Sequence, residues 1–406
     1  MLILLLKLLV PFVVILQLLP LLIWLERKGS AYIQDRTGPN RAQIMGVRLG
    51  GLVHSLADVV KLMFKEDIIP TAVNKPFYIA APMVALFVAS VTFLVVPFAD
   101  NMMAADLNVG ILYVLAMSSL GVYGVMLAGW SSNNKYALLG GIRSSAQMIS
   151  YELSMGLAIL SIVLMSGSLH LGQIVTDQTA TVWHWNFLLQ PLACLIFVVA
   201  SFAETNRSPF DLPEGESELV AGFHVEYSSM KFAMFFMAEY IHMIMASAMI
   251  VTLFFGGWQV PFASTQILRD NANGILHTLS LGFAGFSLVA GLFLVSRFRR
   301  YFKDKRDFEV LVLGVPALLI GVGLLGFVVL QGLPHLNEAM AQILVIILQS
   351  ITFVTKILIM CWVFIWVRWT LPRFRYDQLM NLGWKCMLPL AMLNLFITAV
   401  VMLFLK

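Results

Sequence analysis

Long apolar runs alternate with shorter polar segments along the whole chain. Backbone polar groups inside a bilayer must be satisfied within their own segment, so such runs are helices. Each run is near the roughly 20 residues that a helix needs to cross the hydrocarbon. The pattern predicts an all-α polytopic membrane protein, a single domain over 1–406, with about ten transmembrane helices. We place them at 2–25, 77–98, 109–129, 146–166, 187–203, 232–256, 278–297, 310–330, 341–367 and 387–405.

One polar segment, the loop 26–76, has a helical pattern of its own. From Gly51 onward its apolar and polar residues fall on opposite sides of a helix. This periodicity is typical of an amphipathic interfacial helix that lies along the membrane surface or covers a cavity. The apolar face holds Leu52, Leu56, Val59, Val60 and Met63, and the polar face holds His54, Asp58, Lys61 and Lys65.

Composition and charge support a membrane location and fix a topology. The chain of 406 residues is 60% hydrophobic and 12% charged, whereas a soluble domain carries about 25% charged residues. By the positive-inside rule, the loops rich in Lys and Arg face the cytoplasm, which leaves both termini outside. Of the 26 basic residues, 22 fall in the loops 26–76, 130–145, 204–231, 297–309 and 368–386.

Several chemistries are excluded by what the sequence lacks. The three cysteines, Cys194, Cys361 and Cys386, are far apart and have no spacing for a metal or an iron–sulfur cluster. The sequence contains no phosphate-binding loop and no dinucleotide fingerprint. We therefore expect no metal site and no covalently bound cofactor in this chain.

The acidic segment 204–239 is unusual because it lies between two apolar runs. It holds seven of the 22 acids, with only Arg207 and Lys231 to offset them. One interpretation is a capped helix on a wet surface, with Asp211 as N-cap and acids in the opening turns. The other is a functional group of carboxylates. The acids are Glu204, Asp211, Glu214, Glu216, Glu218, Glu226 and Glu239.

Three ionisable side chains are predicted to lie at membrane depth. Glu152, Glu239 and Lys356 lie inside apolar runs, and an ionisable residue there indicates proton or ion movement. The alternative is a structural Lys–Glu pair. Lys356 is a candidate counter-charge if the ninth span packs against the sixth. Phe236 and Met237 lie beside the acids and are candidates to line an apolar ligand path.

Four stretches closely resemble the quinone-proximal membrane subunit of respiratory complex I, NADH:quinone oxidoreductase. The longest runs from Glu204 to Tyr227 and reads ETNRSPFDLPEGESELVAGFHVEY. The other three are Glu26–Lys28 with Arg36–Arg41, Gly129–Ala137 with Ser150–Glu152, and Pro372–Gln378. Motifs of this length in this order are highly specific, and the resemblance covers about 1–258 and 342–406.

The resemblance implies roles for two sets of residues. It places one set beside the path of the quinone, which is the substrate: Glu26, Arg27, Arg36, Asp58, Phe236, Met237 and Arg368. It places the other set in an acidic relay that couples quinone reduction to proton pumping: Glu152, Asp211, Glu214, Glu216, Glu218, Glu226 and Glu239, to which we add Lys356.

The resemblance also implies partners and a location. Iron–sulfur clusters and flavin belong to partner subunits, and this chain carries no redox centre. The expected partners are the peripheral-arm quinone-site and iron–sulfur subunits, small membrane subunits, antiporter-like pumping subunits and the lipid bilayer, with no nucleic acid. We expect the bacterial cytoplasmic (inner) membrane in preference to the mitochondrial inner membrane.

Two departures from the family pattern stand out. Family members usually have eight helices, so we interpret 278–330 as a two-helix insertion. His54-Ser55 stands where members commonly have Gln-Pro, which weakens the transfer of contacts near the quinone entrance.

Two other functions stay open at this point. A membrane anchor of a related hydrogenase-type or other donor:quinone complex would share much of this design, although the acidic run favours the NADH:quinone branch. A stand-alone cation transporter would need internal symmetry between halves, and the acids cluster only once.

Overall fold

The computed structural model describes the chain except for residues 1, 179–180, 213–220, 299–306, 331–335 and 406. The described residues form helices and no β-strand. Eight segments among them are long and apolar enough to cross a membrane, which confirms the all-α polytopic fold class. The helices that match the ten predicted spans are α1 Leu2–Ile33, α3 Lys75–Val91, α4 Gly110–Ser131, α5 Lys135–Ser166, α8 Pro191–Glu204, α10 Ser229–Phe254, α12 Ala272–Ser296, α13 Asp307–Leu330, α14 Glu338–Thr370 and α16 Leu388–Leu405.

Two predicted boundaries are wrong for local reasons. Helix α5 begins at Lys135 and not at 146, because the side chain of Asn134 accepts a hydrogen bond from the Tyr136 N–H (3.0 Å) and caps the helix. The predicted span 187–203 is divided into α7 Asn186–Leu189 and α8. Pro191 opens α8, a position where its missing N–H costs nothing.

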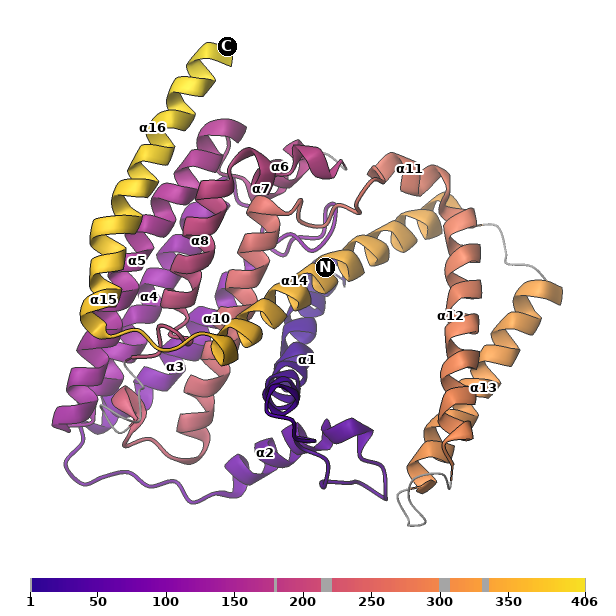
Figure 1. Cartoon of the computed structure of the whole chain (residues 1–406), viewed down its shortest axis with the longest axis horizontal. Helices are drawn as coiled ribbons and strands as arrows, with labels where there is room; N and C mark the ends of the chain where they lie inside the picture. The colour runs from indigo at the N-terminus through magenta and orange to yellow at the C-terminus, as the bar shows by residue number, and fades with distance from the viewer. Residues whose placement is uncertain (1, 179–180, 213–220, 299–306, 331–335, 406) are drawn as a thin grey trace.

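The helices α3, α4, α5, α8, α10 and α16 form one bundle (Figure 1). Small residues allow its backbones to approach closely. A Cβ on Gly129 of α4 would lie 2.6 Å from the carbonyl oxygen of Ala137 on α5. A Cβ on Gly140 of α5 would lie 2.8 Å from Cα of Gly222, in the short helix η4 Gly222–His224. Such glycine contacts replace the hydrophobic driving force that lipid does not supply.

Helix α10 is the core of the molecule. It packs against α3, α8, α1 and α14, and every residue from Ser247 to Phe254 is buried. Helix α14 runs obliquely between this bundle and the hairpin of α12 and α13 (Figure 1). The sixth and ninth spans therefore pack together, as the hypothesis for Lys356 requires.

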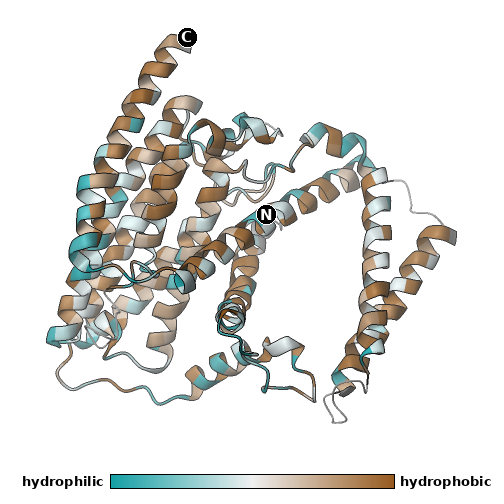
Figure 2. Cartoon of the chain, in the orientation of Figure 1, coloured by the Kyte–Doolittle hydropathy of each residue, from teal (hydrophilic) through white to brown (hydrophobic). Residues whose placement is uncertain are grey.

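The hairpin of α12 and α13 packs mainly on itself. A Cβ on Gly291 of α12 would lie 2.7 Å from Cγ of Leu318 on α13. At one end, the carboxylate of Glu309 accepts a hydrogen bond from the Leu49 N–H (2.8 Å). The two helices of the hairpin are largely hydrophobic, as Figure 2 shows, and Phe286 and Leu319 are among their exposed side chains. The origin of the hairpin as an insertion stays a prediction.

The predicted amphipathic helix is α2, Val53–Phe64. The hydroxyl of Ser55 donates to the carbonyl of Pro20 (2.9 Å), which holds α2 against α1. Leu56, Val59 and Met63 are exposed in the isolated chain. An exposed apolar face of this kind is suited to contact with lipid or another protein chain.

Candidate functional site

A buried carboxylate, Glu26, lies near the end of α1 between two arginines. Its Oε2 accepts hydrogen bonds from Nη1 of Arg207 (3.1 Å) and from the hydroxyl of Tyr240 (2.7 Å). Its Oε1 is paired with Nη1 of Arg368 on α14. The Arg207 guanidinium carbon also lies 4.3 Å from the centroid of the Tyr240 ring. Two cations and a hydroxyl compensate one buried anion, which keeps Glu26 charged.

Asp211 forms a second ion pair beside this cluster. Its Oδ2 accepts a hydrogen bond from Nη2 of Arg373 (3.0 Å). Burial raises the pKa of Asp211 to about 6, although Arg373 acts in the opposite direction. Its Oδ1 has no hydrogen-bond partner among the described residues, and neither do Nε and Nη2 of Arg207. Unpaired donors and an unpaired acceptor therefore lie side by side, which suits a ligand that both accepts and donates.

These groups line a polar cavity of about 120 Å³, which we call the entrance cavity. It combines charged groups with phenyl rings from the start of α10, where Phe232 and Phe236 stack with centroids 6.2 Å apart. The lining residues are Asn206, Arg207, Ser208, Asp211, His224, Phe232, Phe235, Phe236, Glu239 and Arg368.

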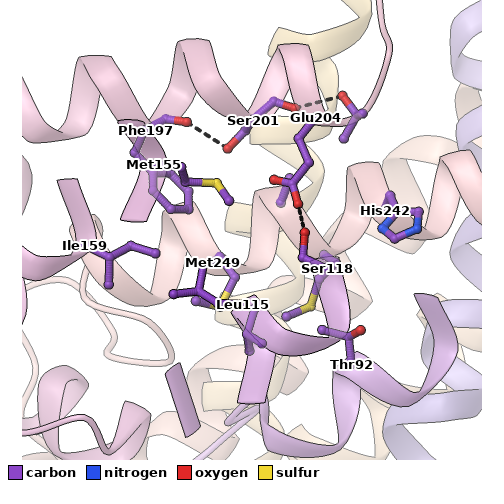
Figure 3. Close-up of a pocket in the computed structure, with 14 residues that line it drawn as sticks. Thr92, Leu115, Ser118, Met155, Ile159, Phe197, Ser201, Glu204, His242 and Met249 are labelled. Atoms are coloured by element: carbon purple, nitrogen blue, oxygen red, sulfur yellow. Dashed lines mark hydrogen bonds between the residues drawn. The ribbon is translucent and has the colours of Figure 1, made fainter. Parts of the chain in front are cut away.

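Two glutamates deeper in the bundle have hydroxyl partners instead of cations. The carboxylate of Glu204, the last residue of α8, accepts a hydrogen bond from the hydroxyl of Ser118 on α4 (Figure 3). The carboxylate of Glu152 on α5 accepts a hydrogen bond from the hydroxyl of Ser119, which follows Ser118 on α4. Glu152 and Glu204 also interact electrostatically. Among the described residues, no Lys, Arg or His forms an ion pair with either carboxyl group.

Two smaller cavities lie in the bundle and share lining residues in series with the entrance cavity. The middle cavity, about 40 Å³, shares Glu239 and Asn206 with the entrance cavity. The inner cavity, also about 40 Å³, shares Glu204 and His242 with the middle one (Figure 3). Volumes of this size can hold water where polar groups face them. The three cavities are therefore adjacent, through shared lining residues, from the arginine cluster to Glu204. Glu152 lines none of them and interacts with Glu204.

The residues predicted for the quinone path divide into three groups. Glu26, Phe236 and Arg368 belong to the entrance cavity or its walls. Arg27 pairs with Asp58 on α2 (Nη1–Oδ2 2.5 Å), and both are partly exposed. The other two lie elsewhere: Arg36 is exposed and bonded to Gln34, and Met237 packs against the hydrophobic core.

The residues predicted for the acidic relay are also divided. Glu239 interacts electrostatically with Arg207 and Asp211. Glu226 lies apart, where its carboxyl accepts a hydrogen bond from Nδ2 of Asn134 (2.7 Å). Three acids, Glu214, Glu216 and Glu218, lie outside the described residues, as does the helix that Asp211 was expected to cap.

Lys356 does not pair with a glutamate of the described chain. Its Nζ donates to three backbone carbonyls just beyond α10, those of Phe255, Gly257 and Gln259, at 2.8–3.0 Å. This end of α10 is about 24 Å from Glu239, at 1.5 Å per residue. Lys356 therefore neutralises the negative end of a helix dipole, and it is not the counter-charge of any glutamate in the described part of the chain.

Five residues of the site could not be assigned a role in it from the sequence. Arg207 was expected to offset neighbouring acids, but it pairs with Glu26, while Lys231 pairs with Asp67 (2.7 Å). Glu204 was noted only as part of the acidic segment, although its position at the end of an apolar run is itself a signal. The others are Tyr240, His242 and Arg373.

Comparisons with known proteins agree on one family. The family model described as "NADH dehydrogenase" matches residues 6–399. The chain is 45% identical over 403 residues to a subunit of the NADH-quinone oxidoreductase of Solibacter usitatus, an alignment that covers 96% of this chain and 94% of that protein. It is 43% identical to the corresponding protein of Salinibacter ruber over 93% of this chain and 90% of that protein. NADH-quinone oxidoreductase subunit 8 of Rhodothermus marinus is 42% identical over 93% and 91%.

Proposed function

The chain belongs to the NADH dehydrogenase family, as a relative of a membrane subunit of NADH-quinone oxidoreductase, and from this premise we propose that it lines the quinone-binding chamber and couples quinone reduction to proton pumping. One observation carries the proposal. A cavity lined by arginines, carboxylates and phenyl rings shares lining residues with a second cavity, and this one shares lining residues with a third, where Glu204 has no cationic partner among the described residues.

The entrance cavity has the chemistry that a quinone headgroup requires. A quinone oxygen accepts hydrogen bonds, and the unpaired Nε and Nη2 of Arg207 are donors. A quinol hydroxyl donates, and the unpaired Oδ1 of Asp211 is an acceptor. Phe232 and Phe236 supply apolar walls for the ring. The chain itself carries no electrons, and partner subunits supply them from iron–sulfur clusters and flavin.

Coupling follows from the electrostatics of the same cavities. A negative charge that forms on the quinone during reduction raises the proton affinity of nearby carboxyls. Asp211 and Glu239 line the entrance cavity and respond first. Interacting acids titrate as a set, so protonation at this end shifts the equilibrium at Glu204 and Glu152. Redox chemistry in a partner is thereby linked to proton movement in this chain.

The cellular location and the partner subunits follow from the same family membership. We propose a cytoplasmic-membrane location with the basic loops inside, and contacts to the peripheral arm and to small and antiporter-like membrane subunits. The exposed apolar face of α2 and the outer face of the α12–α13 hairpin are available for lipid or such subunits. The names of the relatives favour the NADH:quinone reaction over a hydrogenase-type complex or a cation transporter.

Asp211→Asn tests the quinone site because it preserves volume and removes a carboxylate from the entrance cavity. We expect quinone-linked NADH oxidation in assembled complex to fall about tenfold or more, since a hydrogen bond to a charged group contributes about 1.5–3 kcal/mol. NADH oxidation by an artificial acceptor that bypasses quinone should stay at the wild-type rate. Asp377→Asn is the control, since its carboxylate lies in an exposed pair with Arg375. The assignment would be overturned if both activities fell equally or if both stayed at the wild-type rate.

A further inference from the structure

We propose that His242 carries protons between Glu239 and Glu204, an inference that rests on the proposed coupling function. His242 lies on α10 three residues after Glu239, so the two share a face of the helix. It lines both the middle and the inner cavity, and Glu204 lines the same two. Figure 3 shows its ring at the edge of the inner cavity that also holds Glu204 and Ser118.

The surroundings of the ring leave its nitrogens accessible to the cavities. Among the described residues, no hydrogen bond is formed by either ring nitrogen. The facing residue on α4 is Gly121, where a Cβ would lie 3.6 Å from Cε1 and 3.7 Å from Nε2 of the imidazole. Because that position has no side chain, the ring is in contact with space that water can occupy.

Only two other titratable groups line these two cavities among the described residues, Glu204 from α8 and Glu239 from α10 itself. The segments α3, α4 and η2 (Thr92–Val95) contribute the hydroxyls of Thr92 and Ser118 and no charge. Helix α5 contributes apolar side chains to the lining, and its Glu152 acts on the cavities only through Glu204. The histidine therefore lines the same cavities as two carboxyl groups, and no other titratable side chain of the described part of the chain lines them.

Imidazole is suited to this position because it can accept a proton on one nitrogen and release one from the other. In the forward step, the O–H bond of protonated Glu239 breaks and an N–H bond forms on His242, directly or through cavity water. The N–H bond on the opposite nitrogen then breaks, and an O–H bond forms on Glu204. One proton enters and one leaves, and no electron moves. The ring returns to its starting tautomer before the next transfer.

The alternative is a purely structural role, in which the histidine side chain only packs in the core. His242→Gln distinguishes the two, because the amide occupies similar volume and forms hydrogen bonds but cannot carry a proton. His277→Gln on α12 is the control, since His277 lines none of the three cavities. The experiment uses the whole complex in proteoliposomes and measures proton uptake, quinone-linked turnover and artificial-acceptor turnover for the same preparation.

We expect His242→Gln to lower proton translocation about tenfold or more, with artificial-acceptor turnover and His277→Gln both at wild-type values. Wild-type translocation in His242→Gln would overturn the inference. If Glu204→Gln then still fails to pump, the coupling function stands without the histidine, whereas pumping by Glu204→Gln as well removes the coupling function itself. His242→Asn is the second variant, and loss of assembly in both would assign the ring a structural role and overturn the inference.

Discussion

Glu26 is buried and Glu204 is partly buried, and the groups that surround the two carboxyls are opposite in kind. Glu26 is bonded to Arg207, Arg368 and the hydroxyl of Tyr240. Glu204 is bonded to the hydroxyl of Ser118 and has a second carboxyl group, that of Glu152, in its field. Two neighbouring cations favour the charged form of a carboxylate, whereas poor solvation and a second carboxyl group favour its neutral form.

The difference separates two tasks along one series of cavities. The fixed charges at Glu26, Arg207 and Arg368 shape the entrance cavity and present donors to a ligand. We propose that Glu152, Glu204 and Glu239 form the second region, which responds to changes in the entrance cavity. Glu239 lies between the two regions because it lines the entrance and middle cavities and interacts with Arg207.

The largest expected effect comes from breaking the fixed cluster. Arg207→Ala leaves the buried Glu26 with one arginine, and removing one partner of a buried ion pair costs about 3–5 kcal/mol. We expect little assembled complex, measured as the yield of intact complex from membranes on a native gel. Arg375→Ala, which removes an exposed charge, should assemble normally. Wild-type yield for Arg207→Ala would show that the cluster is not structural.

Breaking the variable region should leave assembly intact and abolish coupling. Glu152→Gln keeps the side-chain volume and the bond to Ser119, but it cannot titrate. We expect proton translocation in proteoliposomes to fall about tenfold or more with a normal yield of complex. Glu338→Gln at the start of α14 is the matched control. A normal proton yield with Glu152→Gln would remove this residue from the relay.

A smaller effect is expected at the partly exposed pair of Arg27 and Asp58. Their side chains are 43% and 36% exposed, so the pair contributes about 1 kcal/mol or less to stability. We expect Arg27→Ala and Asp58→Asn to assemble and to lose quinone-linked activity several-fold, while artificial-acceptor activity is kept. Asp67→Asn, which breaks the pair with Lys231, should assemble and keep both activities. Parallel loss of both activities would contradict a role at the quinone path.

The smallest effect is a shift in pH dependence at Asp211. Burial already raises the pKa of this carboxyl to about 6, and Arg373 acts to lower it. Arg373→Ala removes the cation, so the pKa should rise further and the neutral form persist to higher pH. Arg373 is half-exposed, so we expect less than about one pH unit. The infrared carbonyl band that disappears in Asp211→Asn reports this protonation, and a downward shift would reverse the assignment.

The linked stability effect has a defined sign. An aspartate whose pKa is about 6 in the folded state and 3.8 when unfolded binds more protons when folded between these values. Its contribution to the free energy of unfolding therefore falls as pH rises from about 4 to 6. Asp211 therefore destabilises the folded state least when its carboxyl group is neutral.

The fold was largely predictable because hydrophobic length is a local property. Each of the ten apolar runs is helical, although one is divided into α7 and α8. Errors such as the start of α5 at Lys135 arose from a cap that lies outside the apolar run. The depth of Glu152 and Glu239 was read from the same runs. The partners of Glu26 were not predictable from periodicity, because Arg207 and Arg368 are 181 and 342 residues away. Only the resemblance placed Glu26 and Arg368 in one region.

The roles of Lys356 and Glu204 show why local patterns are insufficient. Both are ionisable residues near or within apolar runs. Packing gave Lys356 three carbonyl partners at the end of α10, and gave Glu204 a serine and a cavity. Which of two buried charges is fixed and which is variable depends on neighbours from other helices.

The division between fixed and variable charges is tested most directly by proton translocation in proteoliposomes that contain complex with Glu204→Gln, compared with Glu26→Gln. We predict that Glu204→Gln assembles, keeps artificial-acceptor activity and translocates few or no protons. We predict that Glu26→Gln, which leaves two arginines without their anion, assembles poorly or loses quinone-linked turnover. Wild-type translocation by Glu204→Gln, or loss of pumping by Glu26→Gln with assembly and quinone turnover intact, would contradict this division.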